Sequence, residues 1–127
     1  MDQLTSYGDV VQDVRTGLNE RTEQALKAGV RAEQIIWDPG LGFAKTHEQN
    51  LALLKGLDLL CQEPFPLLVG PSRKRFIGAV LDEPRPKARL WGTAAVACRC
   101  AQAGAALLRV HDVGPISQTL RMAAELW

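Results

Sequence analysis

The 127-residue sequence lacks the features that mark several broad classes of protein. Fifteen Lys and Arg residues balance fourteen Asp and Glu residues, so the formal charge is only +1. That balance gives no broad electrostatic footprint for nucleic acid or for an anionic membrane. The apolar runs are short, as at 67–69 and 105–108, and no transmembrane helix is expected. The sequence therefore predicts neither a nucleic-acid partner nor a membrane partner.

Cysteine is also scarce, with only Cys61, Cys98 and Cys100. One residue separates Cys98 from Cys100, whereas zinc knuckles and redox pairs usually have two residues between their cysteines. Reduced thiols with a packing role are therefore favoured over a disulfide framework. The first six residues lack a basic region followed by an apolar one, so no secretory signal is expected. Both observations favour a cytoplasmic location.

The remaining composition is that of one globular domain, with 46% hydrophobic and 23% charged residues. Helical spacing of apolar residues predicts helices at about 8–28, from near Thr46 to Leu60, at 76–81, at about 90–103 and from Pro115 onward. Thr46 and Gln49 have the spacing of a capping box. Strands are predicted at 35–37, 67–69 and 106–110. Alternating strands and helices pair in parallel, so we predict an α/β fold with about three parallel strands and four or five helices.

Polar or glycine-rich segments follow each of the three predicted strands. These segments are 38–45, 70–74 and 109–112. In parallel α/β proteins, ligands bind at the carboxyl ends of the strands, because loops and helix amino termini meet there. Three such segments at one sheet edge indicate a binding site.

The first segment places a carboxylate, an aromatic ring and an ammonium group in one loop. Asp38 could accept paired N–H donors from an amide-like heterocycle, and an Asx turn or helix cap before Pro39 explains it equally well. Simple packing is the commoner explanation for Phe43. We expect Lys45 to be a solvated charge and His47 to lie on the surface.

The second and third segments are basic. Ser72, Arg73 and Lys74 together suit an anionic substrate, although a solvated basic turn is a common alternative. Lys74 is placed to reach inward and donate to a ring carbonyl or nitrogen. Arg109 and His111 alternate along a strand and share one face, where they would form an anion clamp for phosphate or pyrophosphate.

Taken in order, these motifs resemble the dihydropteroate synthase family of pterin-binding enzymes. The matching positions are 38–45 with Asn50, 68–74 with 77–78, Arg89 with 92–94, and 109–113. The resemblance runs from about Tyr7 to the last residue. The combination is specific, although each motif alone is not.

The resemblance implies a TIM-type (β/α)₈ barrel and a transferase activity in folate biosynthesis. The family condenses 6-hydroxymethyl-7,8-dihydropterin pyrophosphate with p-aminobenzoate, which yields 7,8-dihydropteroate and pyrophosphate. By this resemblance, Asp38 and Lys74 would bind the pterin ring. Ser72, with Phe43 and Arg73, would lie at the p-aminobenzoate site.

The resemblance also assigns the departing pyrophosphate to Arg109 and His111, with Mg²⁺ as a helper. The protein ligand of that Mg²⁺ is expected outside this chain. Lys74, Arg109 and His111 are the predicted catalytic residues. Spreading the charge of the leaving group in this way lowers the barrier to ionisation at the pterin methylene.

The length departs from the family, since a barrel of this type takes about 250 residues. We expect residues 1–127 to be the carboxyl-terminal portion of a pterin-binding barrel, with strands six to eight and without the first five. Such a piece is expected to be inactive alone and to expose open sheet edges. The family commonly dimerises through its last helices, so a homodimer through them is expected.

Three other interpretations stay open. The chain could be a non-catalytic fragment that binds pterin or phosphate, or a pterin-binding barrel like the methyltetrahydrofolate methyltransferases. It could also be a structural fragment that pairs with a missing amino-terminal half. The combination of 72–74 with 109–112 favours the synthase over the methyltransferase, because methyl transfer needs neither a p-aminobenzoate nor a pyrophosphate site.

Overall fold

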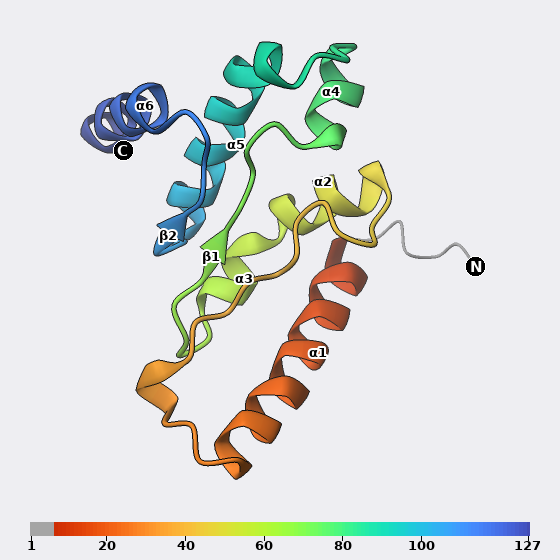
Figure 1. Ribbon diagram of the computed structural model, residues 1–127, viewed down its shortest axis with the longest axis vertical. Helices are drawn as coiled ribbons and strands as arrows, with labels where there is room; N and C mark the ends of the chain where they lie inside the picture. The colour runs from red at the N-terminus through yellow and green to blue at the C-terminus, as the bar shows by residue number, and fades with distance from the viewer. Residues whose placement is uncertain (1–6) are drawn as a thin grey trace.

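The computed structural model describes residues 7–127, which form six α-helices beside a small parallel sheet (Figure 1). The segment 1–6, on which the expectation of no secretory signal rests, lies outside the described residues. In chain order the elements are α1 (Tyr7–Lys27), the 3₁₀ turn η1 (Ala32–Gln34), α2 (His47–Lys55), α3 (Leu57–Cys61), β1 (Leu68–Val69), α4 (Arg75–Leu81), the 3₁₀ turn η2 (Pro86–Arg89), α5 (Leu90–Ala103), β2 (Leu107–Leu108) and α6 (Val113–Leu126). The predicted α/β class is confirmed.

The sheet is smaller than predicted. β1 and β2 pair in parallel, with Leu68 opposite Leu107 and Val69 opposite Leu108. The predicted strand at 35–37 is only an isolated parallel bridge between Trp37 and Leu67. Two features explain its shortness: the Ile35 amide donates to the Ala32 carbonyl in η1, and Pro66 on the neighbouring segment has no N–H to donate back to Ile35. The prediction of three parallel strands is therefore corrected to two strands and one bridge.

The prediction of one helix from Thr46 to Leu60 was wrong, because the chain breaks at Gly56 into α2 and α3. Arg99 of α5 stabilises the break. Its guanidinium donates to the carbonyls of Leu54 and Lys55, each at 2.8 Å. These carbonyls are end groups of α2, which need partners outside their own helix. The chain therefore has more helices in its described part than the predicted four or five.

The starts of α2 and α6 can be compared with the helix starts that the sequence predicts. The capping box at the start of α2 is confirmed, since Thr46 Oγ1 accepts from the Gln49 amide and Gln49 Oε1 accepts from the Thr46 amide. The last helix begins at Val113 rather than at the predicted Pro115. Proline is tolerated there because the first turn of a helix needs no N–H donor.

The core lies on one face of the sheet. Trp37, Leu67 and Val69 point into it and are buried together with leucines of α2 and α3. The indole of Trp37 donates to Thr22 Oγ1 of α1 at 2.8 Å, which ties the long first helix to the sheet. Figure 1 shows α1 packed along α2 and α3, and α6 beside α5, away from α1.

The other face of the sheet carries exposed apolar side chains. Ile36 is 55% exposed and Leu107 is 43% exposed. Within residues 7–127, the helices thus cover the sheet on one side only. None of the helices described there is both long enough and apolar enough to cross a membrane.

The packing of α3 in the core can be tested by substitution. Leu57 is 0% exposed and Leu59, on the same helix, is 37% exposed. Leu57→Ala should lower the free energy of unfolding by about 2–5 kcal/mol, because it removes buried methyl groups and leaves a cavity. Leu59→Ala is the matched control and should cost much less. Urea denaturation of both variants measures the difference, and equal losses would contradict this description of the core.

Candidate active site at the carboxyl ends of the strands

A cavity of about 430 Å³ lies between two of the segments singled out by the sequence. Its walls come from residues 42–50 on one side and from residues 73–76, at the start of α4, on the other. Four of the residues that line the cavity are basic, namely Lys45, Arg73, Lys74 and Arg75. The cavity is therefore suited to a polar, anionic ligand.

The loop at 38–45 is held by its own side chains. Asp38 Oδ1 accepts from the Gly40 amide at 2.9 Å, so the expected Asx turn is present, and the carboxylate stays exposed. The prediction that Lys45 is a solvated charge was wrong. Its Nζ donates to the carbonyls of Pro39, Gly40 and Phe43 at 2.8–3.2 Å. Burial lowers the pKa of Lys45, and the nearby charge of Asp38 opposes this by raising it.

Gly42 brings this loop against the next one. Its φ is +87°, and a Cβ there would lie 2.9 Å from Cδ of Lys74. Asn50, which is buried, accepts from the Gly42 amide at 2.8 Å and fixes the close approach. Lys74 Nζ then lies 4.3 Å from the ring centroid of Phe43, in a cation–π contact. Phe43 is thus an exposed ring that packs under an ammonium group and not in the core.

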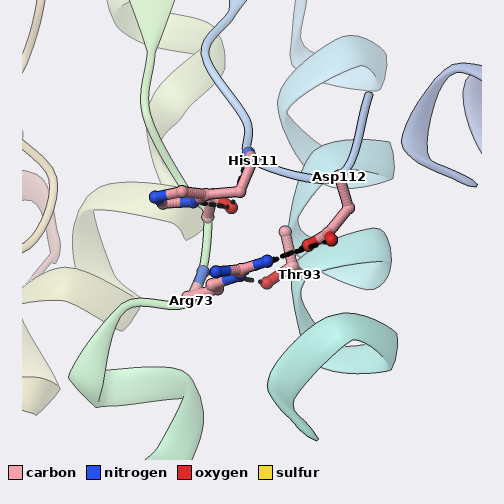
Figure 2. A network of polar contacts seen from close by, with 5 residues as sticks. Arg73, Thr93, His111 and Asp112 are labelled. Atoms are coloured by element: carbon pink, nitrogen blue, oxygen red, sulfur yellow. Dashed lines mark hydrogen bonds and ion pairs between the residues drawn. The ribbon is translucent and has the colours of Figure 1, made fainter. Parts of the chain in front are cut away.

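Arg73 adopts a left-handed conformation, with φ of +60°, at the turn after β1. Its amide donates to Thr93 Oγ1 at 3.0 Å and its carbonyl accepts from Arg89 Nη1 at 2.9 Å. Its guanidinium forms an ion pair with Asp112 at 3.1 Å (Figure 2). All three polar parts of Arg73 are therefore bonded, and its side chain turns toward the end of β2.

Ser72 and His111 form a second link between the same two turns. Ser72 Oγ accepts from the His111 amide at 3.1 Å and lies 2.7 Å from His111 Nδ1. Figure 2 shows the His111 ring reaching back across the turn that carries Arg73, while Asp112 faces the guanidinium. The ends of β1 and β2 are thus joined by side chains as well as by the short ladder.

The structure brings together most of the predicted site residues. The turn at 72–74 touches Phe43 on one side and His111 on the other. Asp38 and Arg109 are both exposed at strand ends, and among the described residues no hydrogen bond or ion pair joins their side chains to this network. His47 is exposed as expected and lies at the cavity wall.

Sequence reasoning assigned no role to Arg89 or Thr93, which hold the two backbone groups of Arg73. Arg89 is buried, and its guanidinium also donates to the carbonyls of Glu83 and Pro84. The four-residue spacing of Arg89 and Thr93 was the available signal, because residues at that spacing share one face of a helix. The partner on the facing turn is not visible in the sequence.

The family model described as "Pterin binding enzyme" matches residues 1–111. The chain belongs to this family. It is similar to the dihydropteroate synthase of Synechocystis sp., with 51% identity over 127 residues, and to that of Haemophilus influenzae, with 47% identity over 116 residues. The first alignment covers 100% of this chain and 44% of the relative, and the second covers 91% and 42%.

Solved structures of dihydropteroate synthases are similar to this chain in fold. The dihydropteroate synthase of Xanthomonas albilineans in complex with 7,8-dihydropteroate has a TM-score of 0.90 and 40% identity, over 93% of this chain and 45% of that one. The enzyme of Coxiella burnetii in complex with pteroic acid has a TM-score of 0.89 and 33% identity, over 95% and 45%. This chain thus spans less than half the length of each of these four relatives.

The hydrogen bond from the Arg73 amide to Thr93 Oγ1 is expected to stabilise the turn after β1. Thr93→Val keeps the shape of a fully buried side chain but leaves the Arg73 amide without its acceptor, so the free energy of unfolding should fall by about 1–3 kcal/mol. Thr16→Val, on the exposed surface of α1, should change it by less than about 0.5 kcal/mol. Urea denaturation compares the two variants. Equal midpoints would show that Thr93 does not stabilise the turn.

Proposed function

We propose that this chain is part of a dihydropteroate synthase, which joins 6-hydroxymethyl-7,8-dihydropterin pyrophosphate to p-aminobenzoate. The observation that carries the proposal is the match to the Xanthomonas albilineans enzyme, solved with 7,8-dihydropteroate, at a TM-score of 0.90. A solved complex of the same enzyme with 4-aminobenzoic acid supports the second substrate. The clustering of basic side chains at the strand ends agrees with an anionic pterin substrate.

Residues 1–127 would form the carboxyl-terminal portion of a (β/α)₈ barrel. The uncovered sheet face supports this arrangement, because Ile36 and Leu107 are apolar and point away from the core. The inner face of such a barrel is filled by branched apolar side chains from all eight strands. The remaining strands would cover this face and pair with the free edges of the sheet.

Binding of the pterin would depend on Asp38 and Lys74. The Asx turn uses one carboxylate oxygen of Asp38 and leaves the other to accept N–H donors from the amino-pyrimidine edge. Lys74 is held between Gly42 and Phe43, so its ammonium group has a fixed place from which to donate to the ring. The cavity beside Lys74 has room for a ring system.

Arg109 and His111 would hold the departing pyrophosphate. The bond from the pterin methylene carbon to the pyrophosphate oxygen breaks, and the leaving group keeps the electron pair. The aniline nitrogen of p-aminobenzoate then attacks the methylene carbon and loses a proton. Donors aimed at the leaving oxygens stabilise the charge that develops there, so the residues after β2 supply the main electrostatic assistance.

The p-aminobenzoate site would include Phe43, with Ser72 and Arg73 nearby. Phe43 is exposed and lies against Lys74, which lines the cavity, so its ring is available near the site. Ser72 and Arg73 already bond to His111 and Asp112, so their contribution would come through the shape of the turn.

Mg²⁺ would assist by neutralising charge on the pyrophosphate. Within residues 7–127 no group of three or more His, Cys, Asp or Glu side chains is placed to hold a metal ion. These residues do not by themselves form a magnesium site, and no step here depends on the ion. Its protein ligand would lie in the part of the family fold that this chain does not span. The cytoplasm is the proposed location of the activity.

The activity is tested by coexpressing this chain with the part of the Synechocystis enzyme that lies outside the 44% that it matches. The copurified assembly should form dihydropteroate, and Arg109→Ala should lower its rate by about a hundredfold, because a donor to the leaving group is lost. Arg121→Ala, an exposed arginine on α6, is the control and should leave the rate unchanged. An assembly that binds pterin pyrophosphate without forming product would support the non-catalytic alternative, and saturable binding of methyltetrahydrofolate would support the methyltransferase.

A homodimer through the last helices is part of the same proposal. Met122, Leu126 and Trp127 are exposed apolar residues at the end of the chain, and α6 packs against its neighbour α5 along one side. Leu126→Glu should convert the dimer to a monomer in size-exclusion chromatography with light scattering. Leu81→Glu, on α4, is the matched control and should not. If the wild-type chain is a monomer at every concentration measured, the proposal of a homodimer is wrong.

A further inference from the structure

The hydroxyl of Ser72 has a single residue as its partner. The side chain is 7% exposed. Its oxygen accepts from the His111 amide at 3.1 Å and lies 2.7 Å from Nδ1 of the same residue. Among the described residues, no other hydrogen bond is made by this hydroxyl.

The position of the proton between Ser72 and His111 follows from hydrogen-bond satisfaction. A serine hydroxyl has one proton to donate, and a neutral imidazole has one N–H and one acceptor nitrogen. If Nδ1 donated to Ser72, the hydroxyl would accept two hydrogen bonds and its own proton would lack a protein acceptor. If Ser72 donates to Nδ1, the hydroxyl accepts one bond and donates one, and every group is satisfied. Buried polar groups are almost always hydrogen-bonded, so the second arrangement is favoured.

We propose that Ser72 is a positioning residue that fixes the tautomer and the direction of His111. Its hydroxyl donates to Nδ1, so the neutral ring carries its proton on Nε2. The second bond, from the His111 amide, holds the backbone of the same residue and prevents the ring from swinging away. This role differs from a direct contact with p-aminobenzoate, because the hydroxyl proton is already used.

The consequence for the site rests on the proposed function. With Nδ1 occupied on the buried side, Nε2–H is the ring donor on the exposed side of His111. A neutral ring in this tautomer donates to an anion oxygen without first binding a proton. Ser72 would then act on the pyrophosphate through His111. The fixed tautomer removes the need to reorganise the ring when charge develops on the leaving group.

The tautomer can be measured in the chain as it stands, without any activity. The sequence has only two histidines, so His47, which is exposed, serves as an internal reference. Long-range ¹H–¹⁵N correlation spectra at alkaline pH distinguish a protonated ring nitrogen from an unprotonated one. We expect His111 to show an unprotonated Nδ1 and a protonated Nε2 as one nearly pure form. His47 should show the averaged signals of a free ring that exchanges between tautomers.

Ser72→Ala should shift both ring nitrogen signals of His111 toward the averaged positions of His47. Ser117→Ala, an exposed serine on α6, is the control and should leave them in place. The backbone amide spectrum of each variant reports whether it is folded. If Ser72→Ala fails to fold, a protonated Nδ1 in wild type still overturns the proposal, and His111 signals nearer to a pure Nε2–H form than those of His47 support it. A protonated Nδ1 in wild type, or signals unaffected by Ser72→Ala in a folded chain, would overturn the proposal whether or not the synthase activity exists.

Discussion

The site depends on one constraint, which is that Arg73 is bonded through its amide, its carbonyl and its guanidinium at once. A left-handed conformation costs a residue with a side chain of order 1 kcal/mol, so it persists only where the surroundings fix it. Here Thr93 and Arg89 bond to the backbone of Arg73, and Asp112 bonds to its side chain. The turn after β1 is therefore held to the start of α5 and to the end of β2 by the same residue.

These side-chain bonds matter because the sheet itself is small. β1 and β2 share only two residue pairs, so the ladder alone sets the relative position of the two strand ends weakly. The Arg73–Asp112 pair and the Ser72–His111 pair add two further links just beyond it. Lys74 follows directly and is placed over Phe43. The spacing of the basic groups is thus a property of the turns more than of the strands.

The sequence predicted those features that depend on residues close by in the chain. It did not predict those that depend on residues far away in the chain. The capping box at Thr46, the Asx turn at Asp38 and the polar strand ends each depend on neighbours within a few residues. The break at Gly56 depends on Arg99, more than forty residues away in the chain. The lysine at position 45 was misjudged because three carbonyls converge on it only once the glycines of its loop adopt positive φ. Likewise, nothing in the 72–74 motif indicates that Arg73 turns toward Asp112.

Some of the basic side chains are held by contacts within this chain, whereas others are exposed to solvent. Arg73, Lys74 and His111 are positioned by contacts within residues 7–127, so their arrangement does not depend on further strands. Among the described residues, no such contact holds the side chain of Arg109. Yet Asp38, Arg109 and His111 are exposed. Attraction between charges is several-fold weaker in water than in a partly desolvated site. Under the proposed function, these donors would bind a pyrophosphate more strongly once other strands cover the exposed face with Ile36 and Leu107. Covering that face would place these ordered side chains in a less solvated environment, as a catalytic site requires.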